Sequence, residues 1–363
     1  MDCDAELALG SQFMAGFNQR ARERRIPISG SIEVTHRCNF NCVHCYLGAQ
    51  SEIHQKSLAS EIPTAKFFQI IDEITEAGCL KLLFTGGDPF FRKDFLEIYK
   101  RAKQNGLVIT IFTNGTLISD AALDVLQAFP PKIIEITLYG ATEQTYESIT
   151  KIPGSYRKCL HTIEKLLAMK AHLKLKTMVM NINKHEFFAM EKMAKDWGVD
   201  FRFDCVVQPK HSGNAEHQNL RLKPEEIVAI NFADPERGKL WVEQDKTRGG
   251  LQTSDLLYNC GAGRIGFHID PYGNLMPCLS SIKYKYSLLT GSFLDGWNNF
   301  IPKIIAQKIP AGFACTKCHN RFLCRFCPAS FYLEGNSETK RADYLCEIGA
   351  LFREMISKLS VEK

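Results

Sequence analysis

Three cysteines lie close together near the start of the chain, at Cys38, Cys42 and Cys45. Thiolates are soft ligands, and proteins use them to bind iron–sulfur clusters, zinc or copper(I). A cubane [4Fe–4S] cluster takes four ligands, and no fourth cysteine lies nearby in the sequence. Such a loop would leave one iron open to a small molecule. A zinc loop is the alternative on spacing alone, although structural zinc more often has a closed set of four ligands.

Seven further cysteines gather between residues 260 and 346. They are Cys260, Cys278, Cys315, Cys318, Cys324, Cys327 and Cys346. Paired C-x2-C units are typical of zinc ribbons, which is the structural alternative. Seven ligands do not divide into fours, however. Four plus three fits one fully ligated iron–sulfur cluster beside another with an open or externally filled site.

The remaining cysteines, Cys3, Cys79, Cys159 and Cys205, are scattered along the chain. We expect Cys3 on a loose terminus and the other three buried as small hydrophobic side chains. The first residues lack the basic start and apolar stretch of a secretory signal, and no apolar run would span a bilayer. We therefore expect a cytoplasmic protein without membrane association, in which a set of 14 cysteines indicates metal ligands or catalytic thiols rather than disulfides.

The bulk composition is that of a soluble globular protein, with 45% hydrophobic and 23% charged residues. A net charge of +5 without any block of Lys and Arg gives no support to nucleic-acid binding. The length of 363 residues suggests two domains, or one large α/β domain with an appendage.

Apolar, β-rich runs alternate with helical patterns over the first two thirds of the chain. We expect strands at 31–35, 79–85, 107–112, 132–138, 172–180 and 200–207, and helices at 64–77, 94–105, 119–128, 156–170, 184–197 and from Pro224. Six βα units in a row predict a parallel sheet with right-handed crossovers, either doubly wound or closed into a whole or partial barrel. In both folds, ligands collect at the carboxyl ends of the strands.

Unusual loops follow the expected strands at that edge. The cysteine triad follows the first strand, and the glycine-rich loops 86–89, 113–115 and 139–140 follow the next three. A glycine pair before Asp-Pro is by itself a common turn, and Asn114 is also explained as a turn residue. After about residue 236 the helix and strand periodicity weakens while glycine, proline and cysteine increase. Such a segment needs staples, which metal centres can supply.

The spacing Cys38-x3-Cys42-x2-Cys45 resembles the cluster motif of the radical S-adenosylmethionine (SAM) superfamily. The resemblance implies a partial (β/α)6 barrel followed by a small cysteine-rich domain. We divide the chain accordingly into an N-terminal extension (1–30), a core domain (31–235) and a C-terminal domain (236–363). It also implies that SAM chelates the open iron, and that the reduced cluster cleaves SAM to a 5′-deoxyadenosyl radical, which abstracts hydrogen from a substrate.

The same resemblance implies a set of SAM contacts: His44, Gly86, Gly87, Asp88, Asn114 and Thr137. His44 would lie against adenine, and Thr137 would meet the ribose, although a strand-end threonine without a ligand explains Thr137 equally well. The sequence 86–89 is similar to the family's Gly-Gly-Glu-Pro motif, where glycines let the backbone approach the methionine ammonium. Asp88 in place of Glu keeps the charge but shortens the reach. For the SAM carboxylate, Arg157, Lys158 and Lys176 are open alternatives.

Residues 260–346 resemble the SPASM extension of radical SAM enzymes, on the cysteine spacing and on the sequence 269–278. The family pattern implies a first auxiliary [4Fe–4S] cluster on Cys260, Cys278 and Cys327. It implies a second on Cys315, Cys318, Cys324 and Cys346, for three clusters in all. In this family the last C-x2-C pair of the run is usually Cys-x3-Cys, whereas here Cys324 and Cys327 are one residue closer together.

Auxiliary clusters in such relatives commonly serve oxidations, so we interpret the chain as an enzyme that oxidatively modifies a ribosomally made peptide. The resemblance implies a reductase such as flavodoxin or ferredoxin. Only about thirty residues precede the first strand, so we expect a separate leader-binding protein. Modification of a small molecule or a tetrapyrrole is the alternative, and a non-catalytic, metal-stapled binding protein is an alternative of another class. Sulfatase maturation is disfavoured, because Leu279 stands where those enzymes carry an acidic general base, and Asp270 is on the other arm of the expected hairpin.

Overall fold

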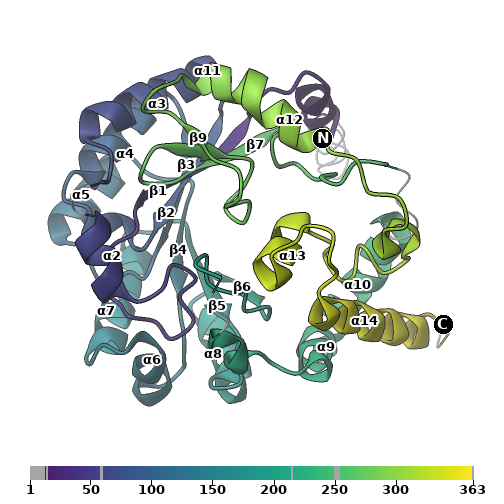
Figure 1. Cartoon of the computed structure of the whole chain (residues 1–363). Helices are drawn as coiled ribbons and strands as arrows, with labels where there is room; N and C mark the ends of the chain where they lie inside the picture. Colours follow the sequence, from purple (N-terminus) through teal and green to yellow (C-terminus); the bar gives the residue numbers. More distant parts are fainter. Residues whose placement is uncertain (1–12, 14, 58–59, 214–215, 249–253, 362–363) are drawn as a thin grey trace, which may run out of the picture.

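The computed structural model describes residues 13, 15–57, 60–213, 216–248 and 254–361, and its centre is one nine-stranded sheet (Figure 1). The first six strands are β1 (Ser29–Thr35), β2 (Lys81–Gly86), β3 (Val108–Thr113), β4 (Ile133–Thr137), β5 (Leu173–Met178) and β6 (Asp200–Asp204). Each of them pairs in parallel with the next in sequence. The sheet is therefore singly wound, and of the two predicted architectures the partial barrel is confirmed.

Helices connect these strands, and most of them cover the outer face of the curved sheet (Figure 1). They are α2 (Gln50–Ser57), α3 (Thr64–Glu76), α4 (Phe95–Gln104), α5 (Asp120–Ala128), α6 (Glu143–Thr150), α7 (Ser155–Ala168) and α8 (Phe187–Asp196). On α3, the fully buried Phe67, Ile70 and Ile74 recur at helical spacing, as the sequence predicts. They pack against strand residues such as Ile32 and Ile109 in one apolar core. The short helices α2 and α6 were not predicted.

The C-terminal third extends the same sheet. Strand β7 (Gly266–Ile269) pairs in parallel with β1, and β8 (Asn274–Met276) and β9 (Tyr286–Ser287) follow in antiparallel order. Two short helices, α11 (Phe293–Asp295) and α12 (Ile301–Ile305), come next. The strand order is β6-β5-β4-β3-β2-β1-β7-β8-β9, so β1 lies inside the sheet with the cysteine triad directly after it.

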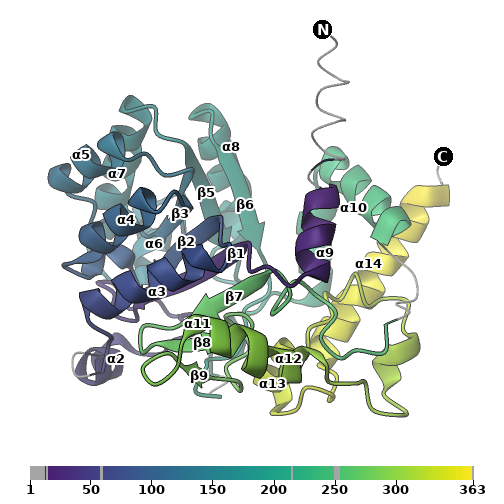
Figure 2. The ribbon, with the colours of Figure 1, turned by 90° about the horizontal axis from the view of Figure 1, so that it is seen from above.

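A second apolar core lies beside the barrel. It joins α9 (Pro224–Phe232), α10 (Pro235–Arg248) and α14 (Asp343–Val361), which lie together in Figures 1 and 2, with α13 (Pro328–Gly335) nearby. The expectation of weak periodicity after residue 236 is wrong here, because Leu345, Ile348, Phe352 and Ile356 form a buried stripe along α14. No helix of the described residues is long and apolar enough to cross a membrane.

Candidate active site

The loop that carries the cysteine triad is pinned by the two helices that were not predicted. The backbone N–H groups of Asn41 and Val43 donate to the last carbonyls of α6, at 3.0 and 3.1 Å. The N–H of Cys38 donates to the Gln50 side chain at the start of α2, at 2.8 Å. Backbone groups that would otherwise be unpaired in an irregular loop are satisfied in this way, and the loop has a defined shape.

A cavity of ≈ 250 Å³ opens at the carboxyl ends of the parallel strands, where the sequence predicts the site. All three triad cysteines line it, together with residues from the loops after β2, β3 and β4. Of the predicted SAM contacts, the lining includes His44, Gly86, Gly87, Asn114 and Thr137. Residues that are far apart in the sequence thus share one wall, as the rule for parallel sheets requires.

The two glycines allow the loop after β2 to lie directly against the triad loop. Gly86 has a φ of +133°, and a Cβ on Gly87 would lie 2.4 Å from the carbonyl oxygen of Arg37. The N–H of Gly87 donates to the carbonyl of Thr35 at 2.8 Å. A side chain at either position would push the two loops apart, which explains the glycine pair sterically.

Asp88 lies behind the cavity wall rather than in it. Its buried carboxylate accepts hydrogen bonds from the Phe90 N–H, the Thr113 hydroxyl and the Asn114 N–H, at 3.0, 2.8 and 2.8 Å. Burial raises the pKa of this carboxyl to about 6, although those hydrogen bonds oppose the shift. The side chain therefore positions the neighbouring loop and is not placed in the cavity to meet a ligand ammonium.

Asn114 does more than form a turn. Its Nδ2 donates to Asn39 Oδ1 at 2.9 Å and lies 3.6 Å from Cys38 Sγ. The Phe40 N–H also donates to that sulfur, at 3.3 Å. Hydrogen bonds to a thiolate stabilise its charge, so this corner suits an anionic sulfur that ligates a metal.

His44, inside the triad loop, and Thr137, the last residue of β4, both line the cavity. The His44 ring contacts Tyr139 edge to face, with centroids 5.1 Å apart. Burial lowers the pKa of His44 to about 4, which keeps its imidazole neutral, and its buried Nδ1 has no hydrogen-bond partner. A neutral ring with a free polar atom suits a planar, polar ligand such as a nucleobase.

The structure distinguishes the three cations that the sequence suggests for the SAM carboxylate, because they lie in different places. Lys176 lies on β5 and lines the cavity, with its Nζ 3.3 Å from the centroid of the Phe112 ring. Burial, and then Arg202, lower the pKa of Lys176 to about 7. Arg157 and Lys158 are exposed on the outer helix α7, where Arg157 pairs with Glu143. Only Lys176 of the three can reach a ligand in the cavity.

A second cavity of ≈ 370 Å³ adjoins the first. The two share His44, Tyr46, Thr137, Tyr139, Lys176 and Leu279 in their walls. The second cavity extends past Arg202, Gln208 and His211. Leu279 faces both cavities, whereas Asp270 accepts hydrogen bonds within its own hairpin, from Tyr272 and Asn274. Asp270 thus does not replace the missing acid at position 279, whereas the carboxylate of Asp204 lines the second cavity.

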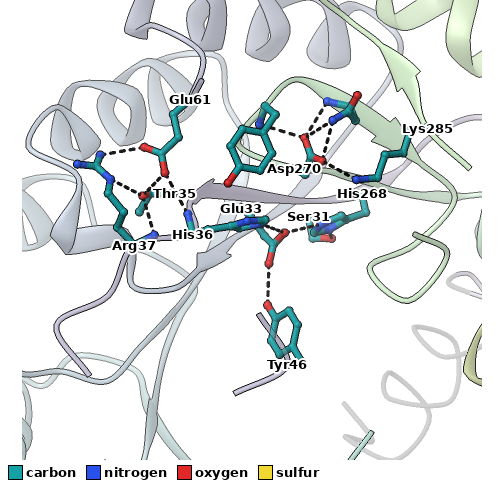
Figure 3. Close-up of polar contacts among 12 residues, drawn as sticks. Ser31, Glu33, Thr35, His36, Arg37, Tyr46, Glu61, His268, Asp270 and Lys285 are labelled. Atoms are coloured by element: carbon teal, nitrogen blue, oxygen red, sulfur yellow. Dashed lines mark hydrogen bonds and ion pairs between the residues drawn. The ribbon is translucent and has the colours of Figure 1, made fainter. Parts of the chain in front are cut away.

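A buried polar network on β1 lies beside these cavities (Figure 3). Glu33 accepts hydrogen bonds from the Tyr46 hydroxyl at 2.6 Å, and its other oxygen is 2.9 Å from His36 Nε2 and 3.2 Å from His268 Nε2. Burial alone would raise the pKa of Glu33, but the two histidines hold it well below its usual range. Tyr46 lines both cavities, and its ring lies tilted against that of His211 with the centroids 4.8 Å apart, so the network supports their shared wall.

Sequence reasoning missed this network, although a signal for it exists. Glu33 is the one charged residue in strand β1, and Tyr46 directly follows the last cysteine of the triad. A charged residue inside a strand that leads into a ligand loop is buried only if it is paired. Its partner His268 is on β7, which no local pattern connects to β1.

The C-terminal cysteines separate into two groups. Cys260, Cys278 and Cys327 line a third cavity, of ≈ 370 Å³. The second group consists of four thiols that lie near one another: Cys315, Cys318, Cys324 and Cys346. Burial is the main cause that raises the pKa of Cys324 to about 12, and the charges of the other three thiols add to this rise. No set of three or more His, Cys, Asp or Glu side chains in the described ranges is close enough together to hold a single metal ion. The cavity instead offers three soft donors around a larger space, which fits a cluster.

The scattered cysteines take no part in these groups. Cys79, Cys159 and Cys205 are buried in apolar surroundings, as predicted, and Cys159 lies in α7. Cys79 and Cys205 lie just outside strands β2 and β6. Cys3 is outside the described residues.

The partial barrel, the cysteine loop at its carboxyl edge and the adjoining cavities define an iron–sulfur enzyme of the SAM-dependent radical class. Residues 32–194 match the model of the Radical SAM superfamily. The AdoMet-dependent heme synthase of Methanosarcina barkeri is 30% identical over 83% of this chain and 90% of its own length. The chain belongs to the radical SAM superfamily, and it accordingly uses SAM and the [4Fe–4S] cluster that defines this class.

Two further relatives connect the chain with SPASM-type maturases. The subtilosin biosynthesis protein AlbA of Bacillus subtilis is 26% identical over 80% of this chain and 62% of its own length. The solved structure of anSMEcpe with bound AdoMet and the Cp18Cys peptide has a TM-score of 0.65 and 16% identity. It covers 92% of this chain and 98% of the solved chain. At this identity the structural likeness shows the fold, which is a radical SAM barrel with a cysteine-rich C-terminal region.

Proposed function

We propose that this enzyme oxidises a ribosomally made peptide by hydrogen abstraction. The observation that supports this most is the pair of adjoining cavities, because a radical formed in the first would face a substrate in the second across their shared wall. When bound there, SAM supplies the 5′-deoxyadenosyl radical. Proximity of this kind is the main contribution of the protein in such chemistry.

We propose that different residues of the cavity bind different parts of SAM. We assign Cys38, Cys42 and Cys45 to the cluster that SAM completes. Gly86 and Gly87 give backbone access for the methionine part, and Lys176 is the proposed partner of its carboxylate. His44 and Asn114 would face the adenosine and Thr137 the ribose, while Asp88 and Glu33 hold the loops in place. Each assignment rests on the position of the side chain in or behind the cavity wall.

We propose two auxiliary [4Fe–4S] clusters, on the two groups of C-terminal cysteines. The group at Cys260, Cys278 and Cys327 supplies three thiolates and the group that includes Cys346 supplies four. Such clusters suit an oxidation, because a substrate radical must lose one electron and one proton to give the product. An external reductase such as flavodoxin or ferredoxin would reduce the SAM cluster, and a separate leader-binding protein would present the peptide.

A peptide substrate fits the mixed character of the second cavity. Its wall includes Met178, Val206 and Val207 beside polar groups such as Gln208 and Ser280. The relative AlbA is a bacteriocin biosynthesis protein, and anSMEcpe was solved with a peptide. Tetrapyrrole modification is the second candidate. It is favoured by the heme synthase relative and by Arg202 in the wall of the second cavity, whose guanidinium suits a carboxylate-bearing substrate.

The test starts with anaerobic reconstitution with iron and sulfide, reduction, addition of SAM, and assays of 5′-deoxyadenosine and iron per chain. We expect deoxyadenosine from the wild type and about twelve irons, which is three cubane clusters. Changing all three triad cysteines to alanine should abolish deoxyadenosine and leave about eight irons. The matched control is C159A, because Cys159 is buried but lies outside both sites. Zinc in place of iron, without deoxyadenosine, would favour a metal-stapled binding protein.

The substrate is then tested by offering a leader-bearing peptide and a tetrapyrrole carboxylate to the loaded enzyme. Loss of two hydrogen atoms from the peptide, detected by mass spectrometry, supports the first candidate. Substrate-dependent deoxyadenosine with the tetrapyrrole alone would replace it by the second.

A further inference from the structure

Arg321 is a buried cation that the proposed function does not yet use. Its side chain is only 4% exposed, and its Nε and Nη1 are buried without a hydrogen-bond partner. A buried, unpaired charge of this kind costs several kcal/mol unless a nearby negative charge compensates for it. An arginine in this state therefore indicates an anionic group close to its guanidinium.

The position of Arg321 shows where this anion belongs. The residue lines the cavity of Cys260, Cys278 and Cys327. In the sequence it lies midway between Cys318 and Cys324, which are members of the other cysteine group. The arginine thus belongs to the surroundings of both groups.

Arg321 contacts Phe326 through both its side chain and its backbone. Its central carbon lies 4.2 Å from the centroid of the Phe326 ring. The Arg321 carbonyl accepts a hydrogen bond from the Phe326 N–H at 2.9 Å. Electrostatics agree with the geometry, because burial lowers the pKa of Arg321 whereas Cys315, Cys324 and Cys318 raise it. The guanidinium is consequently packed on the Phe326 ring inside the protein, within electrostatic reach of these three thiols.

We propose that Arg321 is the shared counter-charge of the two auxiliary cysteine groups and raises the reduction potential of the clusters bound there. The inference rests on the auxiliary clusters of the proposed function. Thiolate-ligated clusters are anionic, and they gain negative charge on reduction. A fixed positive charge nearby stabilises the reduced form, and net charge and hydrogen bonding are known determinants of cluster potentials. Arg321 is a positioning residue for electron transfer, since it touches no substrate.

Arg325 provides a matched control within the same cavity. It also lines the wall around Cys260, Cys278 and Cys327, but its side chain is 58% exposed and lies 3.5 Å from Asp204. Solvent and this carboxylate screen its charge, so its effect on a cluster should be small.

The experiment uses the full chain in which Cys38, Cys42 and Cys45 are alanine, so that only the auxiliary clusters remain. In this background R321Q, R321K and R325Q are reconstituted anaerobically, analysed for iron, and titrated at controlled potential with electron paramagnetic resonance as the readout. We expect full iron and a more negative midpoint in R321Q, by at least tenfold in the one-electron equilibrium constant, which is 59 mV. The midpoint potential of R321K should be close to that of the parent protein, and the midpoint potential of R325Q should be unchanged.

The outcomes separate the two proposals. An unchanged midpoint in R321Q with full iron would overturn the role of Arg321, as would an equal shift in R325Q. If R321Q loses auxiliary iron, the result for R321K distinguishes a role of the positive charge from a role in packing. Retention with parental potentials supports the charge, and loss from both variants shows a packing role instead. A parent protein without auxiliary iron would refute the auxiliary clusters themselves.

Discussion

The carboxylate of Asp88 accepts a hydrogen bond from the backbone N–H of Asn114 at 2.8 Å, and this contact ties the loop after β2 to the loop after β3. The amide of Asn114 in turn lies 3.6 Å from Cys38 Sγ. Two contacts therefore connect a carboxylate outside the cavity with the first cysteine of the triad. In this way a residue that meets no ligand positions the ligand-binding loop.

Replacing Asp88 with alanine should weaken both folding and SAM binding. The change removes a buried acceptor of hydrogen bonds from Phe90, Thr113 and Asn114. We expect a loss of about 2–4 kcal/mol in the free energy of unfolding, measured by urea denaturation, and weaker SAM binding in equilibrium dialysis. D124A, which changes an exposed aspartate on α5, should match the wild type. Unaltered SAM affinity in D88A would contradict the positioning role.

Replacing Lys176 with methionine should stabilise the SAM-free protein but weaken SAM binding roughly tenfold or more, the cost of one charge-assisted hydrogen bond. The pKa of Lys176 is lowered from 10.5 to about 7, so its folded form binds fewer protons than its unfolded form between these values. Stability that is present above pH 10.5 is lost as the pH falls through 7. K176M lacks this dependence.

The measurement for Lys176 is thermal unfolding at pH 6 and pH 9, with SAM affinity determined in parallel. The gain in stability of K176M over the wild type should be larger at pH 6. The control is K174M, on the same strand, where the ammonium is partly exposed and lies 3.7 Å from Asp200. If K174M and K176M lose SAM affinity equally, Lys176 is not the specific partner of the ligand carboxylate.

Replacing Glu33 with alanine should destabilise the fold by about 3–5 kcal/mol, because His36, His268 and Tyr46 lose their buried acceptor. The pKa of Glu33 is held well below 4.5, so its contribution is present above pH 4.5 and is lost as the pH falls below that value. Urea denaturation at pH 7 measures the loss. The exposed E164A on α7 should show none. A wild-type midpoint for E33A would mean that the network is incidental.

Replacing Gly87 with alanine should disrupt the site sterically. The added Cβ would lie 2.4 and 2.5 Å from the carbonyl oxygens of Arg37 and His36, so the triad loop would have to move. We expect G87A to lose most deoxyadenosine formation after reconstitution. In G238A, on α10, the new Cβ would have no neighbour closer than 3.4 Å, and this variant should retain wild-type activity. Equal activity of the two variants would remove the steric explanation for the glycine pair.

The barrel could be predicted because its signals are local. Strands such as β3 carry runs of apolar and β-branched residues, β5 alternates apolar with polar residues, and α3 shows helical spacing in residues such as Ile70 and Ile74. The rule that parallel strands share a ligand-binding edge then brought Cys38, Gly87 and Asn114 to one cavity without any knowledge of distances.

What escaped prediction depends on long-range contacts. Helix α2 is polar and short, and it is stabilised by its contact with the triad loop through Gln50 rather than by an apolar face. Whether Asp88 points into the cavity or behind it depends on a hydrogen bond with Asn114, 26 positions away. From the sequence, Lys176 and Arg157 are equally good alternatives for the partner of the SAM carboxylate. Only the placement of β5 inside the barrel and α7 outside distinguishes them.

The pairing of β7 with β1 affects how the protein can be made. Ser31 and His268 are in contact although 237 positions separate them. During synthesis the edge of β1 remains unpaired until the ribosome has released residue 269, long after β2 has become available. Contacts of such long range slow folding, and a waiting strand edge is prone to pairing with other chains. Production of soluble protein should therefore improve when chaperones that shield this edge are supplied, even before any cluster is inserted.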